Sequence, residues 1–336
     1  MNPFTPARFL LKNKKINDPD LSSGKPMYIF YTGKRIFQIE SGIMHQNFLK
    51  SFGKTPAALL FLSGPGTNAE KLLRDAAASP DAPWRPLALV TDRPETSRAR
   101  ELASDFHLPL IEHDIFAYYR KNGRPRVSLA TEEDLRIREQ WTAELREKLR
   151  NYPADFGILA GFLTLCNITD DLLCLNVHPG DLTVRENGKR IYAGLHRGPT
   201  ERAILRGEKS IRSSVILAGK VGMKGAGMDE GPVLGISDPV ELDLQGMSLA
   251  FLKETAAGRA GKAPAEYADD PLARLALHNV DRLKAAGDWK LFPRVVRDFA
   301  KGLFRMEDGV LCYCGEPVST VWYPDGAAPK PLPPEA

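Results

Sequence analysis

The sequence predicts an α/β protein built on a mostly parallel, doubly wound sheet. Short apolar runs bounded by glycine or proline recur between residues 57 and 177, as buried parallel strands do. Segments with helical periodicity separate these runs, and this alternation indicates a parallel sheet with helices on both faces. Candidate ligand-binding residues follow several of the runs, and doubly wound sheets bind ligands beyond the carboxyl ends of their strands.

Each element is expected from its local pattern. The apolar runs predict strands at 57–62, 87–90, 108–111, 158–160 and 172–177, and the periodic segments predict helices at 68–78, 95–103 and 131–150. Thr131 is expected to cap the last of these helices, because acidic residues follow it in the first turn. From about residue 239 the pattern changes. It predicts helices within 239–258, 271–286 and 291–303, then a terminal hairpin of Leu303–Cys314 with Val318–Tyr323.

The chain divides into three regions. Residues 1–55 are expected to form an N-terminal extension with a hairpin, because two apolar and aromatic runs, Met27–Tyr31 and Arg35–Ile39, flank Thr32-Gly33-Lys34. Residues 56–324 are expected to form the main domain. The Pro-rich residues 325–336 are expected to be a loose tail.

Composition excludes several classes of protein. With 43% hydrophobic and 26% charged residues, the chain is an ordinary globular protein that can bury a sizeable core. No apolar run approaches the roughly 20 residues needed to span a bilayer, and the N-terminus lacks a signal pattern, so we expect a cytoplasmic protein with no membrane partner. The net charge is only +4 without an arginine-aromatic pattern, so no nucleic-acid partner is expected. Nothing in the sequence indicates an oligomeric state.

The four cysteines are expected to be reduced thiols. Cys312-Tyr313-Cys314 is too tight for the usual zinc spacing, and no histidine lies near it in the sequence. We therefore expect no metal site.

The segment Ser63–Asn68 carries a glycine loop between a predicted strand and a predicted helix. Its glycines let backbone amides approach a ligand, and the helix N-terminus attracts an anion such as a phosphate. Gly64-x-Gly66-x-x-Ala69 also satisfies a dinucleotide-binding pattern, and Asp92 ends the second strand, where it could hold a ribose hydroxyl. This loop alone leaves a phosphate site, a dinucleotide site and a structural turn open.

Asn176 and His178 end a predicted strand, two residues apart, so their side chains share a face. An amide donor beside an imidazole suits acyl transfer, because the amide stabilises an oxyanion and the imidazole exchanges protons near neutral pH. Asp229 lies in a glycine-rich loop before another apolar run, and its carboxylate could hold the histidine in its working tautomer. Each feature has a structural alternative, namely a capped strand end and a plain turn.

Taken in order, these segments resemble the glycinamide ribonucleotide formyltransferase family. The similar segments are Ser63-Gly64-x-Gly66-Thr67-Asn68, Ile158–Leu163, Leu175-Asn176-Val177-His178-Pro179, Gly194-Leu195-His196, Ser214-Val215, Asp229-x-Gly231-Pro232-Val233 and Leu291-Phe292-Pro293. The likeness covers roughly residues 57–324, and residues 1–55 have no counterpart in it.

The resemblance implies a Rossmann-like formyltransferase fold with C-terminal helices, and 10-formyltetrahydrofolate as the co-substrate, without a metal. It implies that Asn176, His178 and Asp229 are catalytic and that a protonated His178 stabilises the oxyanion. The residues that match the substrate phosphate site are Gly66, Thr67 and Asn68. Those that match the folate site, largely through their backbone, are Leu163, Thr164, Leu165 and Cys166. Asp288 matches an acid near the substrate ribose, and His196 lies in a loop that borders the site.

The implied acceptor is a primary amine on a small, phosphorylated molecule resembling phosphoribosylglycinamide, which would belong to purine biosynthesis and one-carbon metabolism. Several departures from the family pattern leave the acceptor open. They are Gly180-Asp181-Leu182 after the His-Pro pair, expanded segments at 183–193 (with Arg185, Lys189 and Arg190) and 219–227, and Thr164 where an arginine is common.

Four alternatives follow from these observations. A formyltransferase could act on an amino sugar or amino acid derivative. Transfer to an initiator tRNA is disfavoured, because residues 239–336 show no basic excess. A dinucleotide-binding oxidoreductase is favoured only by Asp92. A protein that keeps this fold could also be catalytically silent.

Overall fold

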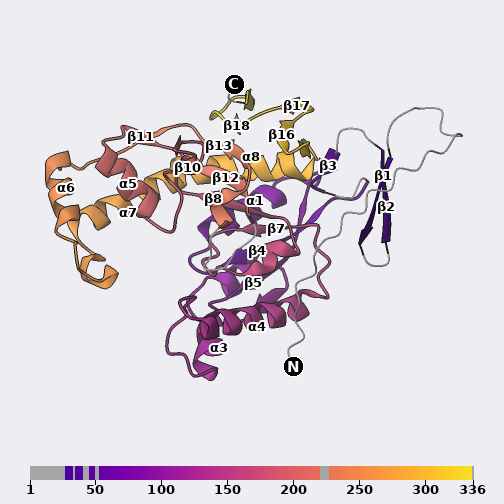
Figure 1. The fold of residues 1–336 in the computed structure, drawn as a ribbon, viewed down its shortest axis with the longest axis horizontal. Coiled ribbons are helices and arrows are strands. Elements are labelled where there is room, and N and C mark those ends of the chain that lie inside the picture. The colour runs from indigo at the N-terminus through magenta and orange to yellow at the C-terminus, as the bar shows by residue number, and fades with distance from the viewer. Residues whose placement is uncertain (1–26, 33–34, 41–44, 50–52, 220–226, 335–336) are drawn as a thin grey trace, which may run out of the picture.

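The computed structural model describes residues 27–32, 35–40, 45–49, 53–219 and 227–334. Its centre is a nine-stranded mixed sheet with the strand order β19-β18-β13-β12-β8-β7-β4-β5-β6 (Figure 1). These strands are β4 (Ala57–Leu62), β5 (Arg85–Thr91), β6 (Leu110–Glu112), β7 (Phe156–Leu159), β8 (Cys174–His178), β12 (Ser214–Leu217), β13 (Val233–Ile236), β18 (Thr320–Trp322) and β19 (Lys330–Leu332).

The predicted doubly wound, parallel arrangement is confirmed for the first five strands. β6, β5, β4, β7 and β8 pair in parallel, and the chain order reverses at β4, with β5 on one side and β7 on the other. Beyond β8 the sheet becomes mixed, because β12 runs antiparallel to both β8 and β13. The reversal beside β4 is the position at which such sheets bind ligands.

Helices cover both faces of the sheet, and each face has its own apolar core. One face packs against α1 (Thr67–Ala77), α2 (Ala99–Asp105) and α8 (Trp289–Ala300), and the other against α3 (Ile115–Lys121) and α4 (Glu132–Leu149). Every residue of β4 is buried, as expected for a strand covered on both faces. The predicted cap is confirmed, because the Thr131 hydroxyl accepts the backbone N–H of Asp134 at 3.1 Å.

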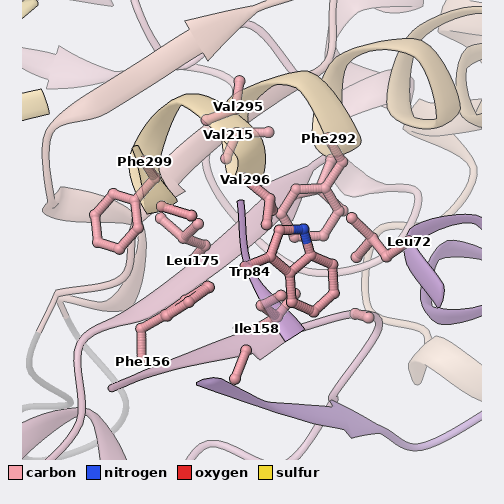
Figure 2. Packing of buried hydrophobic residues seen from close by; sticks show 14 of the residues in the cluster. Leu72, Trp84, Phe156, Ile158, Leu175, Val215, Phe292, Val295, Val296 and Phe299 are labelled. Carbon is pink, nitrogen blue, oxygen red and sulfur yellow. The ribbon is translucent and has the colours of Figure 1, made fainter. Parts of the chain in front are cut away.

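Aromatic and branched side chains join α8 to the sheet. Figure 2 shows Phe292, Val296 and Phe299 of α8 in the same cluster as Phe156 of β7 and the nearby Trp84. The Phe156 ring lies 5.5 Å from the Phe299 ring and 6.3 Å from the Trp84 ring, centroid to centroid. Fully burying side chains of this size stabilises the fold by about 1.5–3 kcal/mol each. This packing fixes the last long helix against the strands that carry the candidate site.

Three helices form a separate layer beside the sheet. α5 (Gly198–Arg206), α6 (Leu249–Ala257) and α7 (Pro271–Leu283) share a small apolar core and lie together at one side of Figure 1. A π-helical turn, Lys284–Asp288, connects α7 to α8. Single π-helical turns often occur at functional positions, and this one brings Asp288 close to the start of α1.

Several short elements complete the fold. They are β1 (Met27–Thr32), β2 (Arg35–Glu40), β3 (His45–Asn47), β9 (Arg185–Glu186), β10 (Lys189–Arg190), β11 (Ser210–Ile211), β14 (Val240–Glu241), β15 (Phe304–Glu307), β16 (Val310–Tyr313) and β17 (Glu316–Pro317). The N-terminal hairpin is confirmed, because β1 and β2 pair antiparallel with Thr32 opposite Arg35. Its turn, residues 33–34, lies outside the described residues, as does much of the region 1–55.

The C-terminal expectations were partly wrong. Residues 304–313 form a hairpin by themselves, and β16 pairs with β17 rather than with β18. β18 instead joins the main sheet parallel to β13. The expected loose tail is also wrong for β19, which pairs antiparallel with β18. α3 and α5 were not expected from the sequence.

No helix within the described ranges combines the length and apolar character needed to cross a bilayer. The four cysteines form no disulfide, and three of them are buried while Cys314 is exposed.

Candidate active site

Three loops meet at the carboxyl ends of β4, β7 and β8. The loop after β4 contacts the loop after β7 twice: the Ser63 N–H donates to the Gly161 carbonyl at 3.1 Å, and the Leu163 N–H donates to the Ser63 hydroxyl at 2.8 Å. β8 lies beside β7, with Asn176 opposite Leu159. The glycine loop, the predicted folate segment and the Asn-His pair therefore share one edge of the sheet.

His178 is buried and held in one orientation. Its side chain lies in the interior, with the whole residue 3% exposed. Its Nε2 lies 2.6 Å from the Tyr192 carbonyl oxygen. A carbonyl can only accept, so Nε2 carries the hydrogen of the neutral ring, and Nδ1 is the nitrogen that gains or loses a proton. Nδ1 lies 3.7 Å from Oδ1 of Asp229.

The surroundings of His178 influence its protonation in opposite directions. Burial lowers the pKa of His178 below its ordinary value, and the opposing effect of Asp229 is smaller; Arg202 and Arg190 lower the pKa further. A lowered pKa favours the neutral ring near pH 7 in the absence of substrate, and the protonated ring implied by the resemblance would form during the reaction. A neutral Nδ1 facing a carboxylate is suited to accept a proton first and to carry the positive charge afterwards.

Asp229 lies on the short helical turn η3 (Met228–Glu230), with its side chain 21% exposed. Its second oxygen, Oδ2, accepts the Gly194 N–H at 3.0 Å. The carboxylate is therefore oriented by the Gly194 backbone through one oxygen and faces the imidazole with the other.

Asn176 lies two residues before His178 on β8, opposite Ile216 of β12. Its side chain is half-buried. No described residue hydrogen-bonds to the Asn176 amide, so its N–H groups remain available to a ligand. The structure thus brings the three predicted catalytic residues together.

The glycine loop leads directly into α1. Gly66 adopts a left-handed conformation with φ of 64° at the N-cap, where no side chain caps the helix. A Cβ at this position would come within 2.8 Å of the Leu62 and Leu102 side chains, so glycine is required both by its φ and by its neighbours. An uncapped helix N-terminus presents free N–H groups, here those of Thr67 and Asn68, to an anion.

Asp288 contacts the glycine loop through the side chain of Asn68. It is 6% exposed, and both of its oxygens are engaged: Oδ2 accepts the Asn68 amide at 3.1 Å and Oδ1 accepts the Ser213 hydroxyl at 2.5 Å. Burial raises the pKa of Asp288. The arrangement makes Asp288 a support for Asn68, and a direct contact with a substrate would have to displace one of these partners.

The predicted folate segment follows β7. The side chains of Thr164 and Cys166 are buried, and those of Leu163 and Leu165 are half-buried. The Leu165 carbonyl accepts a hydrogen bond from the buried Arg138 of α4. Burial raises the pKa of the Cys166 thiol to about 11, so it is not a reactive thiolate at neutral pH.

Asp92 is unavailable for a ribose. The residue is 0% exposed, and Oδ2 of its carboxylate accepts a hydrogen bond from the Thr164 hydroxyl. The role considered for Asp92 in a dinucleotide site is therefore wrong: this carboxylate is buried and bonded to the predicted folate segment.

The remaining predicted residue, His196, is exposed on the loop before α5, with φ of 55°. The ring of His196 forms no hydrogen bond with the described residues. Within the described ranges, no cluster of three or more His, Cys, Asp or Glu side chains is placed to hold a metal ion.

Sequence reasoning missed Tyr192 and Arg202. Tyr192 contributes its backbone carbonyl to His178, and Arg202 contacts the carbonyls on either side of Tyr192. A backbone carbonyl carries no side-chain signature, and only the folded chain brings these residues together.

No family model matches this sequence, and no curated protein matches it either. Solved structures do. The fold is similar to that of glycinamide ribonucleotide transformylase 1 from Symbiobacterium toebii, with a TM-score of 0.51 and 20% identity over 79% of this chain and 97% of that chain.

Two further solved proteins are similar to the same extent. The phosphoribosylglycinamide formyltransferase of Coxiella burnetii has a TM-score of 0.51 and 16% identity, over 81% of this chain and 100% of that chain. That of Anaplasma phagocytophilum has a TM-score of 0.51 and 17% identity, over 81% of this chain and 100% of that chain. At these identities the comparisons confirm the predicted Rossmann-like formyltransferase fold.

Proposed function

We propose that the protein is a folate-dependent formyltransferase that moves a formyl group from 10-formyltetrahydrofolate to a primary amine. The observation that carries this proposal is the His178 ring, whose Nε2 is bonded to a backbone carbonyl while Nδ1 faces Asp229. Asn176 on the same strand supplies a free amide beside it. The fold shared with solved formyltransferases supports the same reaction class.

The reaction begins when the acceptor amine attacks the formyl carbon, forming a C–N bond and a tetrahedral oxyanion. Neutral Nδ1 of His178 takes the proton that the amine loses. The resulting imidazolium is stabilised by Asp229, and together with the Asn176 amide it stabilises the oxyanion. The bond between the formyl carbon and N10 then breaks, and His178 returns its proton to N10. The products are a formamide and tetrahydrofolate.

Each substrate has a place consistent with this chemistry. The phosphate of the acceptor would bind the N-terminus of α1 through the backbone of Gly66, Thr67 and Asn68, because the Asn68 amide is already committed to Asp288. The folate would lie along residues 163–166, where it meets mainly backbone, since two of those four side chains are buried.

The acceptor that fits best is a small phosphorylated amine resembling phosphoribosylglycinamide, and such an enzyme would act in cytoplasmic purine biosynthesis. An amino sugar or amino acid derivative remains the alternative acceptor. The oxidoreductase hypothesis loses its one supporting residue, because Asp92 is fully buried and hydrogen-bonded.

Ligand-induced stabilisation tests the reaction class. A ligand at about 100 times its dissociation constant stabilises the folded state by about 2.7 kcal/mol, and each kcal/mol moves the melting midpoint of a domain of this size by roughly 2–4 °C. A non-hydrolysable folate analogue should raise the midpoint by several degrees, while NAD and NADP should leave it nearly unchanged. A shift with NAD and none with folates would exclude the formyltransferase.

An acceptor screen with 10-formyltetrahydrofolate and mass detection of the formylated product tests the finer proposal. Thr67→Asp places a carboxylate in the proposed anion cradle and should weaken a phosphorylated acceptor at least tenfold, by like-charge repulsion, while folate binding is unchanged. The matched control is Ala78→Asp, which adds the same charge at the exposed far end of α1. Equal acceptor affinity in both variants would remove the phosphate from this loop.

A further inference from the structure

One five-residue segment contacts both members of the His178–Asp229 pair. We name residues 190–194 the strap; it begins in β10 and ends before α5. The Tyr192 carbonyl accepts from Nε2 of His178 at 2.6 Å, and the Gly194 N–H donates to Oδ2 of Asp229 at 3.0 Å. The distance between imidazole and carboxylate is therefore linked to the position of a single backbone segment.

Arg190 ties the strap to the loop that carries Asp229. Its guanidinium donates to two backbone carbonyls at once: Nη1 donates to that of Asp229 and Nη2 to that of Gly231, the latter at 2.8 Å. A planar guanidinium spans two such acceptors in a fixed geometry, which a lysine ammonium cannot reproduce. Arg190 thus holds the backbone of Asp229 itself.

The other side of the strap is anchored to α5. Nε of Arg202 donates to the Ile191 carbonyl at 2.8 Å, and Nη2 donates to the Ala193 carbonyl. The Tyr192 hydroxyl donates to Oε1 of Glu208 at 2.6 Å. These contacts fix the backbone of the strap. The strap therefore holds the Tyr192 carbonyl and the Gly194 N–H in defined positions.

The loop that carries Asp229 also rests against the end of β12. The Gly219 N–H donates to the Met228 carbonyl at 3.0 Å, and a Cβ on Gly231 would meet the Leu217 carbonyl oxygen at 1.8 Å. This contact sets how close the loop lies to the sheet. The contacts between this loop and the strap are separate from it, and they are made by Arg190 and by the Gly194 N–H.

We propose that Arg190 is a positioning residue, which sets the separation of Asp229 from Nδ1 of His178 by fixing the Asp229 loop to the strap. The proposal rests on the proposed function only for its consequence on rate. It deepens that function, since Arg190 lies in the segment, 183–193, that departs from the family pattern.

Arg190→Lys separates geometry from charge. The charged groups that influence His178 are Asp229, Arg202 and Arg190, and the lysine keeps the third positive charge while losing the two-carbonyl contact. If Asp229 moves away, His178 loses the interaction that favours its charged form, so it should titrate at lower pH than in the wild type. Turnover should fall about tenfold, as expected for loss of a group that orients a catalytic residue, with the KM for folate within about twofold.

The His178 ring is titrated by NMR, with its signal assigned from His178→Gln, and the rate is measured separately. Arg185→Lys is the matched control: it lies on the same hairpin and bonds to the Gly188 carbonyl at 2.8 Å, away from Asp229. In an Asp229→Asn background, Arg190→Lys should produce no further shift, because the carboxylate it positions is gone.

An unchanged His178 titration in Arg190→Lys overturns the proposal, as does an equal shift with and without the Asp229 carboxylate. The titration needs no substrate. A shift in the His178 pKa that occurs only when the Asp229 carboxylate is present therefore supports the positioning role even if no acceptor is ever formylated. Failure of the proposed function alone would leave the titration result intact and remove only the rate effect.

Discussion

Two buried histidines lie at the carboxyl edge of the same sheet, and they differ in one respect that matters. His178 ends β8, and His113 directly follows β6. His178 is 3% exposed and His113 is 7% exposed. Each places Nε2 against a backbone carbonyl, that of Tyr192 for His178 and that of Trp141, at 3.0 Å, for His113. Burial lowers the pKa of both.

Their surroundings are different. The His113 ring stacks on Trp141 with a centroid distance of 4.9 Å, and the Trp141 indole donates back to the His113 carbonyl at 3.2 Å. The nearest carboxylate to His113, that of Glu144, lies 3.9 Å from Nε2 and has a side chain that is 58% exposed. Around His178, a carboxylate held by backbone faces Nδ1, the nitrogen that titrates.

The comparison shows that burial, a fixed tautomer and a lowered pKa do not identify a catalytic histidine. All three follow from placing an imidazole in an apolar interior beside a carbonyl. His178 has three further features that His113 lacks. Its titrating nitrogen faces an oriented carboxylate, a free amide lies beside it, and an anion-binding helix N-terminus lies at the same edge of the sheet. Perturbed pKa values are evidence of function only with that geometry.

The largest expected effect is on turnover, and it should differ sharply between alanine variants of the two histidines. His178→Ala should lower turnover about 100-fold or more while the fold persists, because it removes the proton acceptor at a strand end. His113→Ala should cost about 2 kcal/mol of stability, through the lost ring stacking and the unpaired Trp141 carbonyl, with turnover nearly unchanged. Steady-state kinetics and denaturant unfolding of both variants test this. Near-wild-type turnover in His178→Ala would mean that His178 is not the proton acceptor.

A smaller effect should come from Gly180, which lies between His178 and the strap. A Cβ there would meet the Tyr192 carbonyl oxygen at 2.8 Å and Nε2 of His178 at 3.2 Å. Gly180→Ala should therefore push these two groups apart, free the tautomer of His178 and lower turnover about tenfold, with an overpacking cost of about 1–3 kcal/mol. Gly198→Ala is the control, since the Cβ there meets only Arg202, at an ordinary 3.6 Å. Equal rates in the two variants would show that the carbonyl contact is dispensable.

The same comparison explains what the sequence could and could not predict. Runs such as 57–62 predict strands because a strand buried on both faces must be continuously apolar. The Asn176–His178 spacing predicts a shared face because side chains alternate along a strand. Both signals are local, and both are confirmed by the sheet.

Longer-range contacts were beyond the sequence. The glycine loop and Asp92 were compatible with a dinucleotide site until packing placed Thr164 against that carboxylate. The parallel pairing of β18 with β13 likewise joins residues more than 80 positions apart, so the expected terminal hairpin was wrong. The lowered pKa of His178 was beyond the sequence for the same reason: desolvation depends on everything packed around the ring, and the resemblance conveyed only which residue types are present.

The smallest effect concerns pH, and it tests what the two histidines share. Both folded-state pKa values lie below the ordinary value, so the unfolded chain binds more protons than the folded one as pH falls below about 6.5. The contribution of each histidine to stability is thus complete above about pH 6.5 and is lost as pH falls toward the folded pKa. Each can add at most about 1.4 kcal/mol per pH unit to the slope. The raised pKa values of Asp92 and Asp288 act with the opposite sign, so the total slope does not isolate the histidines.

The difference between wild type and a variant does isolate them. His178→Gln and His113→Gln should each flatten the dependence of the unfolding free energy on pH between about 5 and 7, because glutamine binds no proton in that range. Urea unfolding at several pH values measures this. A slope that flattens for His113 but not for His178 would mean that Asp229 already compensates the burial of His178 in the resting protein, so that its pKa is the same in the folded and unfolded chain.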